Sequence, residues 1–446
     1  MTNIYGLFLR TRNLTKRYPN PERIGNRIMM NKMKYRIEII ALFLRPFYRV
    51  KLSSKRQSDE ETDNFETRKI LFSTETKTYQ SDAPSAAQLK KRNGYRRLAW
   101  MITGISLIHA LVFLTVEFIR PDWNHVDYAL RLQRLRKLIA ENPGKPIGIA
   151  LGNSRTSMGL DSSTLSRLSN TNLFSMAFPG SGPVQNIVYL KRIFADGIRP
   201  DYVMIEIHPC IFFNPISETQ HIIETSNRAN LCWDNIGIRD LEVLNRYPDL
   251  DASITRDWLL NRTEIMRTHR DDWLILANSK WSFIDLRSRY NRFGFDDHGW
   301  LPLPFPPSSV TKEIKETVIQ EAKDGYYSTL QKGEIGTRSV KAFEELIDLL
   351  EQSQIPCVLY TMPEGTIFHS WYSTKFESQF QDWLRSIQER HSVSLIDTRS
   401  WLSEDSFFDS HHLMPEGATQ FAKRFGLEVL IPFLENHRLL IPFKKK

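Results

Sequence analysis

The sequence predicts an α/β protein. We expect a three-layer sandwich with a central parallel five-stranded sheet, preceded by one transmembrane helix and a basic N-terminal arm. Short apolar runs alternate with amphipathic segments between residues 146 and 434, which is typical of a parallel sheet that helices cover on both faces. Upstream, the 19 residues 98–116 include no Asp, Glu, Lys or Arg, and this is about the length that crosses a bilayer.

The N-terminal arm, residues 1–97, carries the basic excess of the chain. It holds 22 Lys and Arg residues against 9 Asp and Glu residues, whereas the rest of the chain holds 38 against 42. The net charge of +9 therefore does not indicate a basic face on the folded part, and no nucleic acid is expected as a partner. Because residues 51–95 are polar and show no hydrophobic period, we expect the arm to be cytoplasmic and largely disordered.

A single transmembrane helix is predicted for residues 98–119. The basic cluster at residues 90–97 directly precedes it, and positive residues usually stay on the cytoplasmic side. We therefore expect a single-pass membrane protein with a cytoplasmic N-terminus and an extracytoplasmic C-terminal domain. The alternatives are a buried core helix and a cleaved signal peptide. The late start of the apolar run and the lack of a small-x-small exit disfavour the signal peptide.

The remaining elements follow in the order of an α/β domain. Residues 120–145 are predicted to form a stalk helix and linker, because leucines recur at helical spacing in residues 127–141. The domain itself occupies residues 146–434, with an insertion at 212–332, and a basic C-terminal tail follows at 435–446. The expected strands are 147–151, 173–178, 201–208, 356–362 and 393–397, and the expected helices are 161–168, 184–196, 337–352, 374–390 and 415–434.

The insertion at 212–332 is too long for an ordinary loop and predicts a functional lid or a small subdomain. It contains a proline-rich segment at residues 301–307. An insertion rich in Arg and Trp suits stacking on sugar rings or clamping of an anionic polymer. The alternative is that the aromatic side chains pack the insertion onto the sheet. The tryptophans concerned are Trp233, Trp258, Trp273, Trp281 and Trp300.

A serine follows the first expected strand, within the sequence Gly152-Asn153-Ser154. Parallel sheets bind ligands in the crevice beyond the carboxyl ends of their strands, which is where this turn places Ser154. A serine hydroxyl is a weak nucleophile and needs an adjacent base, and a histidine oriented by a carboxylate provides one. The alternative is that Ser154 only caps the following turn.

Such a base stands near the C-terminus, within Asp409-Ser-His-His412. The spacing of Asp409 and His412 allows one short loop to present a carboxylate and an imidazole together. We predict Ser154 as the nucleophile, His412 as the base and Asp409 as the group that orients it. His411 is the alternative base. A polar helix cap and a turn former are the structural alternatives for the histidines and for Asp409.

The ordered set of Gly152-Asn-Ser154, Gly180 after the second strand, and Asp409-x-x-His412 before the last helix resembles the SGNH (GDSL-type) hydrolase superfamily. The variant Gly-x-Ser-Arg at residues 152–155 and the ending His-Leu-x-x-x-Gly-Ala at residues 412–418 resemble its membrane-anchored, extracytoplasmic branch, which includes exopolysaccharide O-acetyltransferases. Two departures stand out. The usual Gly-Asp-Ser is Gly-Asn-Ser here, and no Gly-x-Asn-Asp follows the third strand. That slot reads Glu206-Ile-His-Pro209, with Asn214 further on.

The resemblance implies a membrane-anchored serine O-acyltransferase or O-acyl esterase. It would act on a cell-envelope or secreted polysaccharide through an acyl-Ser154 intermediate. Backbone N–H groups of Ser154 and Gly180 would form the oxyanion hole, because a glycine lets the backbone approach the carbonyl closely. The implied partners are a carbohydrate polymer or acyl ester as substrate, the membrane, and a membrane-bound protein that supplies the acyl group. No cofactor is expected.

Two other functions stay open. The first is a catalytically inactive SGNH-like domain that binds polysaccharide or scaffolds an envelope assembly complex, which the missing Asn favours. The second is a structural membrane protein in which the serine and the histidines are incidental. No metal is expected, since the three cysteines, Cys210, Cys232 and Cys357, lie too far apart for a zinc site.

Overall fold

The computed structural model describes residues 86–214, 236–247, 256, 258–260, 262–278, 286–391 and 393–440. The chain separates into two units, residues 1–94 and residues 95–446. The disorder predicted for the N-terminal arm falls mostly on residues 1–85, which lie outside the described residues. Trp233, Trp281 and the last six residues of the predicted basic tail lie outside them too.

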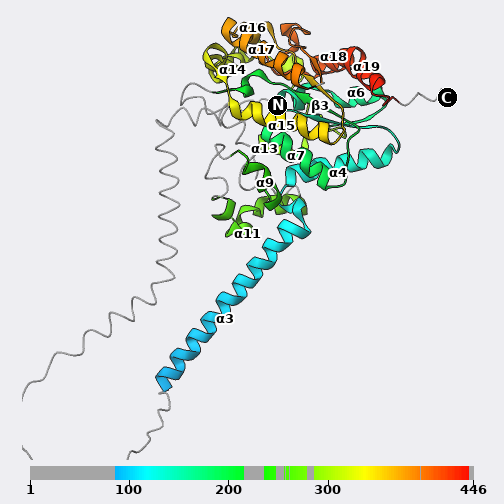
Figure 1. Cartoon of the computed structure of the whole chain (residues 1–446). Coiled ribbons are helices and arrows are strands. Elements are labelled where there is room, and N and C mark those ends of the chain that lie inside the picture. The colour runs from blue at the N-terminus through cyan, green and yellow to red at the C-terminus, as the bar shows by residue number, and fades with distance from the viewer. Residues whose placement is uncertain are drawn as a thin grey trace, which may run out of the picture. The chain divides into compact units, whose positions relative to one another are not determined.

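The second unit is built on a five-stranded sheet in the order β2-β1-β3-β6-β7, and every pair in it is parallel. Figure 1 shows β3 of this sheet among the helices of the unit. This confirms the mixed α/β class and the five-stranded parallel sheet. Each strand lies within or close to its predicted range. The bounds are β1 (Ile147–Leu151), β2 (Asn172–Ser175), β3 (Tyr202–Glu206), β6 (Cys357–Tyr360) and β7 (Ser394–Ile396).

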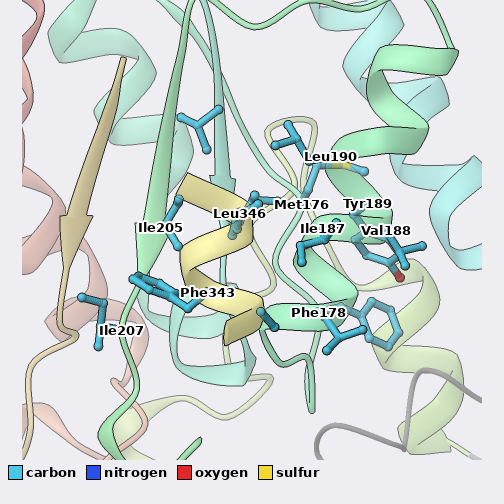
Figure 2. Packing of buried hydrophobic residues seen from close by; sticks show 14 of the residues in the cluster. Met176, Phe178, Ile187, Val188, Tyr189, Leu190, Ile205, Ile207, Phe343 and Leu346 are labelled. Atoms are coloured by element: carbon cyan, nitrogen blue, oxygen red, sulfur yellow. The ribbon is translucent and has the colours of Figure 1, made fainter. Parts of the chain in front are cut away.

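The central strands of this sheet are buried on both faces, which explains why β1, β3 and β6 are largely apolar rather than alternating. In β3, Val203 and Ile205 belong to one hydrophobic core, whereas Tyr202 and Met204 belong to another. Successive side chains of a strand point to opposite faces, so the two cores lie on the two sides of the sheet. Figure 2 shows the first core, where side chains of two helices meet Ile205.

Helices supply the rest of both cores. The first core receives side chains from α4 (Val126–Glu141), α7 (Pro183–Ala195), α15 (Thr337–Gln352) and α17 (Thr374–Arg390). The second receives them from α6 (Ser162–Ser169), α18 (Pro415–Phe425), the π-helical turn η10 (Gly426–Leu430) and α19 (Ile431–Asn436). Two short helices, α5 (Ser154–Gly159) and α16 (Thr366–His369), follow β1 and β6.

Helix α4 corrects the prediction of a stalk. The predicted helix is present, but Leu132, Leu135 and Leu138 are buried in the first core. Arg131 is also buried and donates to the carbonyl groups of Ser175 and Gly299, each at 3.0 Å. The segment is therefore an integral helix of the α/β unit rather than a spacer.

The insertion is closed at its base by a small antiparallel sheet. Strand β4 (Phe213–Asn214) pairs with β5 (Glu334–Ile335), which brings the two ends of the insertion together. The described elements between these strands are α9 (Leu241–Leu244), α11 (Ile265–Thr268), α12 (Arg270–Ala277), α13 (Leu286–Phe293), α14 (Lys312–Lys332) and the 3-10 turns η5 (Ile238–Asp240) and η8 (Pro307–Ser309).

The described tryptophans of the insertion pack within the structure. Each indole N–H donates to a backbone carbonyl: Trp258 to Ile236 at 2.9 Å, Trp273 to Trp123 at 3.2 Å, and Trp300 to Met158 at 2.8 Å. A buried or half-buried indole usually finds such a partner. These three side chains therefore join the insertion to its surroundings, in line with the structural alternative.

Among the described residues, one helix is long and apolar enough to cross a membrane, over Asn93–Ile119. It consists of α3 (Ala86–Leu114) and the π-helical turn η1 (Thr115–Ile119), and the 3-10 turn η2 (Pro121–Trp123) follows. Helix α3 begins before the predicted start of the span. The basic cluster at residues 90–97 is therefore helical rather than part of a disordered arm.

A buried ion pair fixes the end of this helix to the insertion. The Arg262 guanidinium lies 2.7 Å from the Glu117 carboxylate, and both side chains are almost fully buried. Glu117 also accepts the backbone N–H of Ile238 at 2.9 Å. Removing one partner of such a pair leaves an uncompensated buried charge, so Glu117 and Arg262 hold the end of this helix against the insertion.

Candidate active site

The turn after β1 presents Ser154 as the first residue of α5. The Asn153 side chain caps that helix, because its Oδ1 accepts the N–H of Arg155 at 2.8 Å. Gly152 is needed here, since a Cβ would lie 2.5 Å from Oγ1 of Thr156 and 2.6 Å from a carboxylate oxygen of Glu206. The tight turn leaves Ser154 partly exposed, while its neighbours on both sides are buried.

A short loop before α18 presents the histidines. An isolated antiparallel bridge between Phe407 and Leu413 closes this loop, and Ser410 adopts a left-handed conformation with φ of 68°. Oδ1 of Asp409 accepts the backbone N–H groups of His411 at 3.2 Å and His412 at 2.7 Å. The carboxylate therefore fixes the backbone that carries both histidines.

The structure brings Ser154, His412 and Asp409 together. Nε2 of His412 lies 2.8 Å from Oγ of Ser154, and Nδ1 of His412 lies 2.8 Å from Oδ2 of Asp409. Burial alone would raise the pKa of Asp409, but His411 and His412 hold it well below its usual range. An ionised Asp409 accepts a hydrogen bond from Nδ1–H of His412, which leaves the unprotonated Nε2 of His412 free to accept the proton of the Ser154 hydroxyl.

His411, the alternative base, occupies a different place. Its side chain is 4% exposed, stacks on Phe368 at 5.1 Å and meets the edge of Tyr326 at 5.1 Å. Burial lowers the pKa of His411 to about 3, so the ring is neutral at physiological pH. His411 therefore contacts the insertion, through Tyr326, and does not face solvent. The hydrogen bond to Ser154 comes from His412.

A cluster of buried charged side chains anchors the turn that carries Ser154. The Arg155 guanidinium contacts Glu364 at 3.0 Å and Glu206 at 4.0 Å. Glu206 in turn accepts the backbone N–H of Asn153 at 3.0 Å and the hydroxyl of Thr156 at 2.6 Å. Burial would raise the pKa of Glu364, but Arg155 holds it below its usual range. The cluster anchors the residues on both sides of Ser154.

Sequence reasoning did not identify Arg155, Glu206 or Glu364 as site residues. The available signal was their position: Glu206 ends β3, and Glu364 follows β6 by a few residues. Charged side chains at the carboxyl ends of neighbouring parallel strands meet at one edge of the sheet. Reading those strand ends together would have indicated a polar cluster beside Ser154.

The predicted oxyanion-hole residues lie on the two turns after β1 and β2. Gly180 has a φ of 81°, a left-handed conformation that favours glycine. The N–H of Ser154 belongs to the first turn of α5, where helical N–H groups have no intrahelical acceptor. Asn214, which follows the third strand at a distance, lies in β4 at the base of the insertion.

Two groups of side chains in the described residues bring potential metal ligands within 4.8 Å of one another: Asp409 with His411 and His412, and Asp348 with Glu351 and His391. In the first group, Nδ1 of each histidine already faces Asp409, and Nε2 of His412 faces Ser154. The second group is largely exposed. The hydrogen bonds of the first group join a hydroxyl, an imidazole and a carboxylate in series.

Buried histidines are expected to make the fold sensitive to mild acid. Burial is the main cause that lowers the pKa of His125 and His208 well below 6.5 and that of His411 to about 3. Below pH ~6.5 the unfolded chain binds protons that the folded chain excludes, so stability falls as the pH decreases. Each histidine contributes a loss of about 1.4 kcal/mol per pH unit in that window.

Thermal unfolding of the full chain in detergent at about pH 7.5 and about pH 5.5 measures this effect. The unfolding midpoint should be lower at the acidic pH, and a His125→Gln variant should lose less than the wild type. Midpoints that agree within about 1 °C at the two pH values would contradict neutral burial of these histidines.

One family model, that of an uncharacterised family, matches residues 313–432. No curated protein matches the chain. The matched segment contains Asp409 and His412 but ends short of Ser154, which lies upstream of it. The match therefore covers only the C-terminal part of the α/β unit, from α14 to the start of α19.

Proposed function

We propose that this protein is a membrane-anchored serine O-acyltransferase or O-acyl esterase that acts on a cell-envelope or secreted polysaccharide. The observation that carries the proposal is the hydrogen-bonded series from Ser154 through His412 to Asp409, with both contacts at 2.8 Å. Ser154 stands 258 positions before His412 in the sequence, whereas Asp409 and His412 belong to one short loop. A nucleophile, a base and an orienting carboxylate in this order form the constellation used in acyl transfer.

The reaction would proceed in two steps. Oγ of Ser154 attacks the acyl carbonyl while Nε2 of His412 takes the hydroxyl proton, and Asp409 stabilises the imidazolium that forms. The N–H groups of Ser154 and Gly180 donate to the oxyanion. Collapse breaks the ester bond, and His412 returns the proton to the departing oxygen. Water or a sugar hydroxyl then attacks acyl-Ser154 through the same base, which gives hydrolysis or transfer.

The architecture supports the same proposal. The two hydrophobic cores on opposite faces of the parallel sheet suit a three-layer sandwich of the SGNH type. The serine turn follows β1 and the histidine loop precedes α18, as in the pattern that the sequence resembles. For transfer rather than hydrolysis, the proposed partners are a membrane-bound protein that supplies the acyl group and a carbohydrate polymer that receives it.

Turnover of an activated ester tests the proposal. The full chain in detergent should hydrolyse p-nitrophenyl acetate, with a burst of p-nitrophenol that reports acetyl-Ser154. Added oligosaccharides that act as acceptors should divert the acetyl group from water to sugar. A protein that is folded, as judged by a cooperative thermal transition, and yet releases no p-nitrophenol above the detergent blank would contradict the enzymatic function.

The second candidate is a catalytically inactive SGNH-like domain that binds polysaccharide or scaffolds an envelope complex. The observation that favours it is the missing Gly-x-Asn-Asp after β3, where the chain reads Glu206-Ile-His-Pro209. Binding of a polysaccharide without any ester turnover, equal in the wild type and in Ser154→Ala, would support this candidate.

The proposed membrane topology gives a separate prediction. Because the basic cluster at residues 90–97 precedes the apolar segment, the N-terminus should stay in the cytoplasm and the α/β unit should face outward. Alkaline phosphatase, which is active only outside the cytoplasm, should therefore be active when fused after Lys446. An inactive phosphatase fusion beside a fluorescent green fluorescent protein fusion at the same position would overturn the orientation.

A further inference from the structure

His208 lies on the same edge of the sheet as Ser154. Strands β1 and β3 are parallel neighbours, and Leu151 pairs with Ile205 at this end. Ser154 and His208 follow those two residues at equal distances along the chain. The Asn153 side chain joins the two segments by a hydrogen bond to His208 at 3.0 Å. The imidazole of His208 is therefore part of the immediate surroundings of the nucleophile.

The hydrogen bonds of Asn153 fix the tautomer of His208. The backbone N–H of Arg155 can only donate, so the Asn153 side-chain atom 2.8 Å from it is the amide oxygen, Oδ1. The other amide atom, Nδ2, then donates to Nδ1 of His208. A neutral imidazole that accepts at Nδ1 carries its proton on Nε2. His208 is thus a donor at Nε2.

This donor has no hydrogen-bond partner within the described part of the chain, although the side chain is only 4% exposed. Burial and the nearby charge of Arg155 hold the pKa of His208 well below its usual range, so the ring stays neutral. A buried donor without an acceptor is costly, and native proteins rarely keep one without a reason.

We propose that the Nε2–H of His208 donates to the substrate carbonyl oxygen as that oxygen becomes negatively charged. This inference rests on the proposed acyl transfer at Ser154. A fixed donor beside the nucleophile stabilises the oxyanion more than the neutral carbonyl and so lowers the barrier. A neutral imidazole suits this role because it donates a hydrogen bond without giving up its proton. His208 is then a catalytic residue, and Asn153 is a positioning residue that holds its tautomer.

The test is the rate at which a fluorophosphonate modifies the full chain in detergent, because the phosphonyl oxygen gains charge in that reaction. His208→Ala removes the donor and should slow modification about 100- to 1000-fold. Asn153→Asp has nearly the same shape and still caps α5, but its carboxylate attracts the imidazole proton to Nδ1 and leaves Nε2 without one. It should slow modification to a similar extent.

Rescue distinguishes this role from a structural one. In the double variant Asn153→Asp, His208→Asn, the carboxylate accepts one amide hydrogen and the other is free for the oxyanion, so at least about tenfold of the loss should return. Exposed His437 serves as control, and His437→Ala should react at the wild-type rate. If His208→Ala does not fold, the modification rate of Asn153→Asp tests the role of His208 instead.

Three outcomes are informative. Slow modification of Asn153→Asp, together with recovery of the rate in the double variant, supports His208 as the hydrogen-bond donor. Wild-type rates in Asn153→Asp and in a folded His208→Ala, with the adduct still on Ser154, would overturn the role of His208 and leave the proposed function intact. A wild-type protein that is not modified at all would overturn both.

Discussion

Ser154→Ala should abolish ester hydrolysis, with a decrease in kcat of about 10⁶-fold, because the nucleophile of a triad has no substitute. The fold should be nearly unaffected. Ser154 is partly exposed, and the contact to His412 is the hydrogen bond its side chain makes, so the change in stability should stay within about 1 kcal/mol. Steady-state hydrolysis of p-nitrophenyl acetate and a thermal melt measure the two quantities.

The control is Ser370→Ala, which removes an exposed hydroxyl that donates to the carbonyl of Ile367 in the preceding helix α16. It should keep wild-type activity. Full esterase activity in Ser154→Ala would show that the hydrolysis comes from another residue, and the assignment of the nucleophile would then be wrong.

His412→Ala should cost as much activity as Ser154→Ala, and the double variant should cost little more, because members of one triad act as a unit. Asp409→Asn should cost less, about 10⁴-fold, since the base itself is kept. His411→Ala should instead act on stability, because its ring is buried against Phe368 and Tyr326. Hydrolysis rates and unfolding midpoints of all four proteins separate these effects.

The adjacent histidines provide matched variants of each other. A His411→Ala protein that is folded and inactive, beside a His412→Ala protein that keeps near wild-type activity, would reverse the assignment of the base while leaving Ser154 in place. Equal and partial losses in both would indicate that the loop, rather than one imidazole, was disturbed.

The parallel sheet was predictable because all five strands are short apolar runs between amphipathic segments. Burial on both faces makes most residues of the central strands apolar, and this signal is local in sequence. The packing of residues 127–141 was not predictable in the same way. Its leucine spacing indicates a helix, but whether that helix stands apart or lies in the core depends on contacts with α7 and the sheet, which are distant in sequence.

The part of the site that was predictable consists of residue types whose chemistry is known. A serine at a strand end and an Asp-x-x-His before the last helix indicate a triad, and the structure places their side chains within hydrogen-bond distance. The choice between His411 and His412 needs the backbone of the loop, where Asp409 accepts two N–H groups. The tautomer of His208 depends on the orientation of one amide, which no sequence pattern encodes.

The most direct measurement of the central claim is mass spectrometry of the full chain after reaction with a fluorophosphonate. Acyl transfer through Ser154 predicts one adduct, located on the peptide that contains Ser154, which forms faster with the base intact than in His412→Ala. An unchanged intact mass of folded protein, or an adduct on a different residue, would contradict the claim that Ser154 is an activated nucleophile.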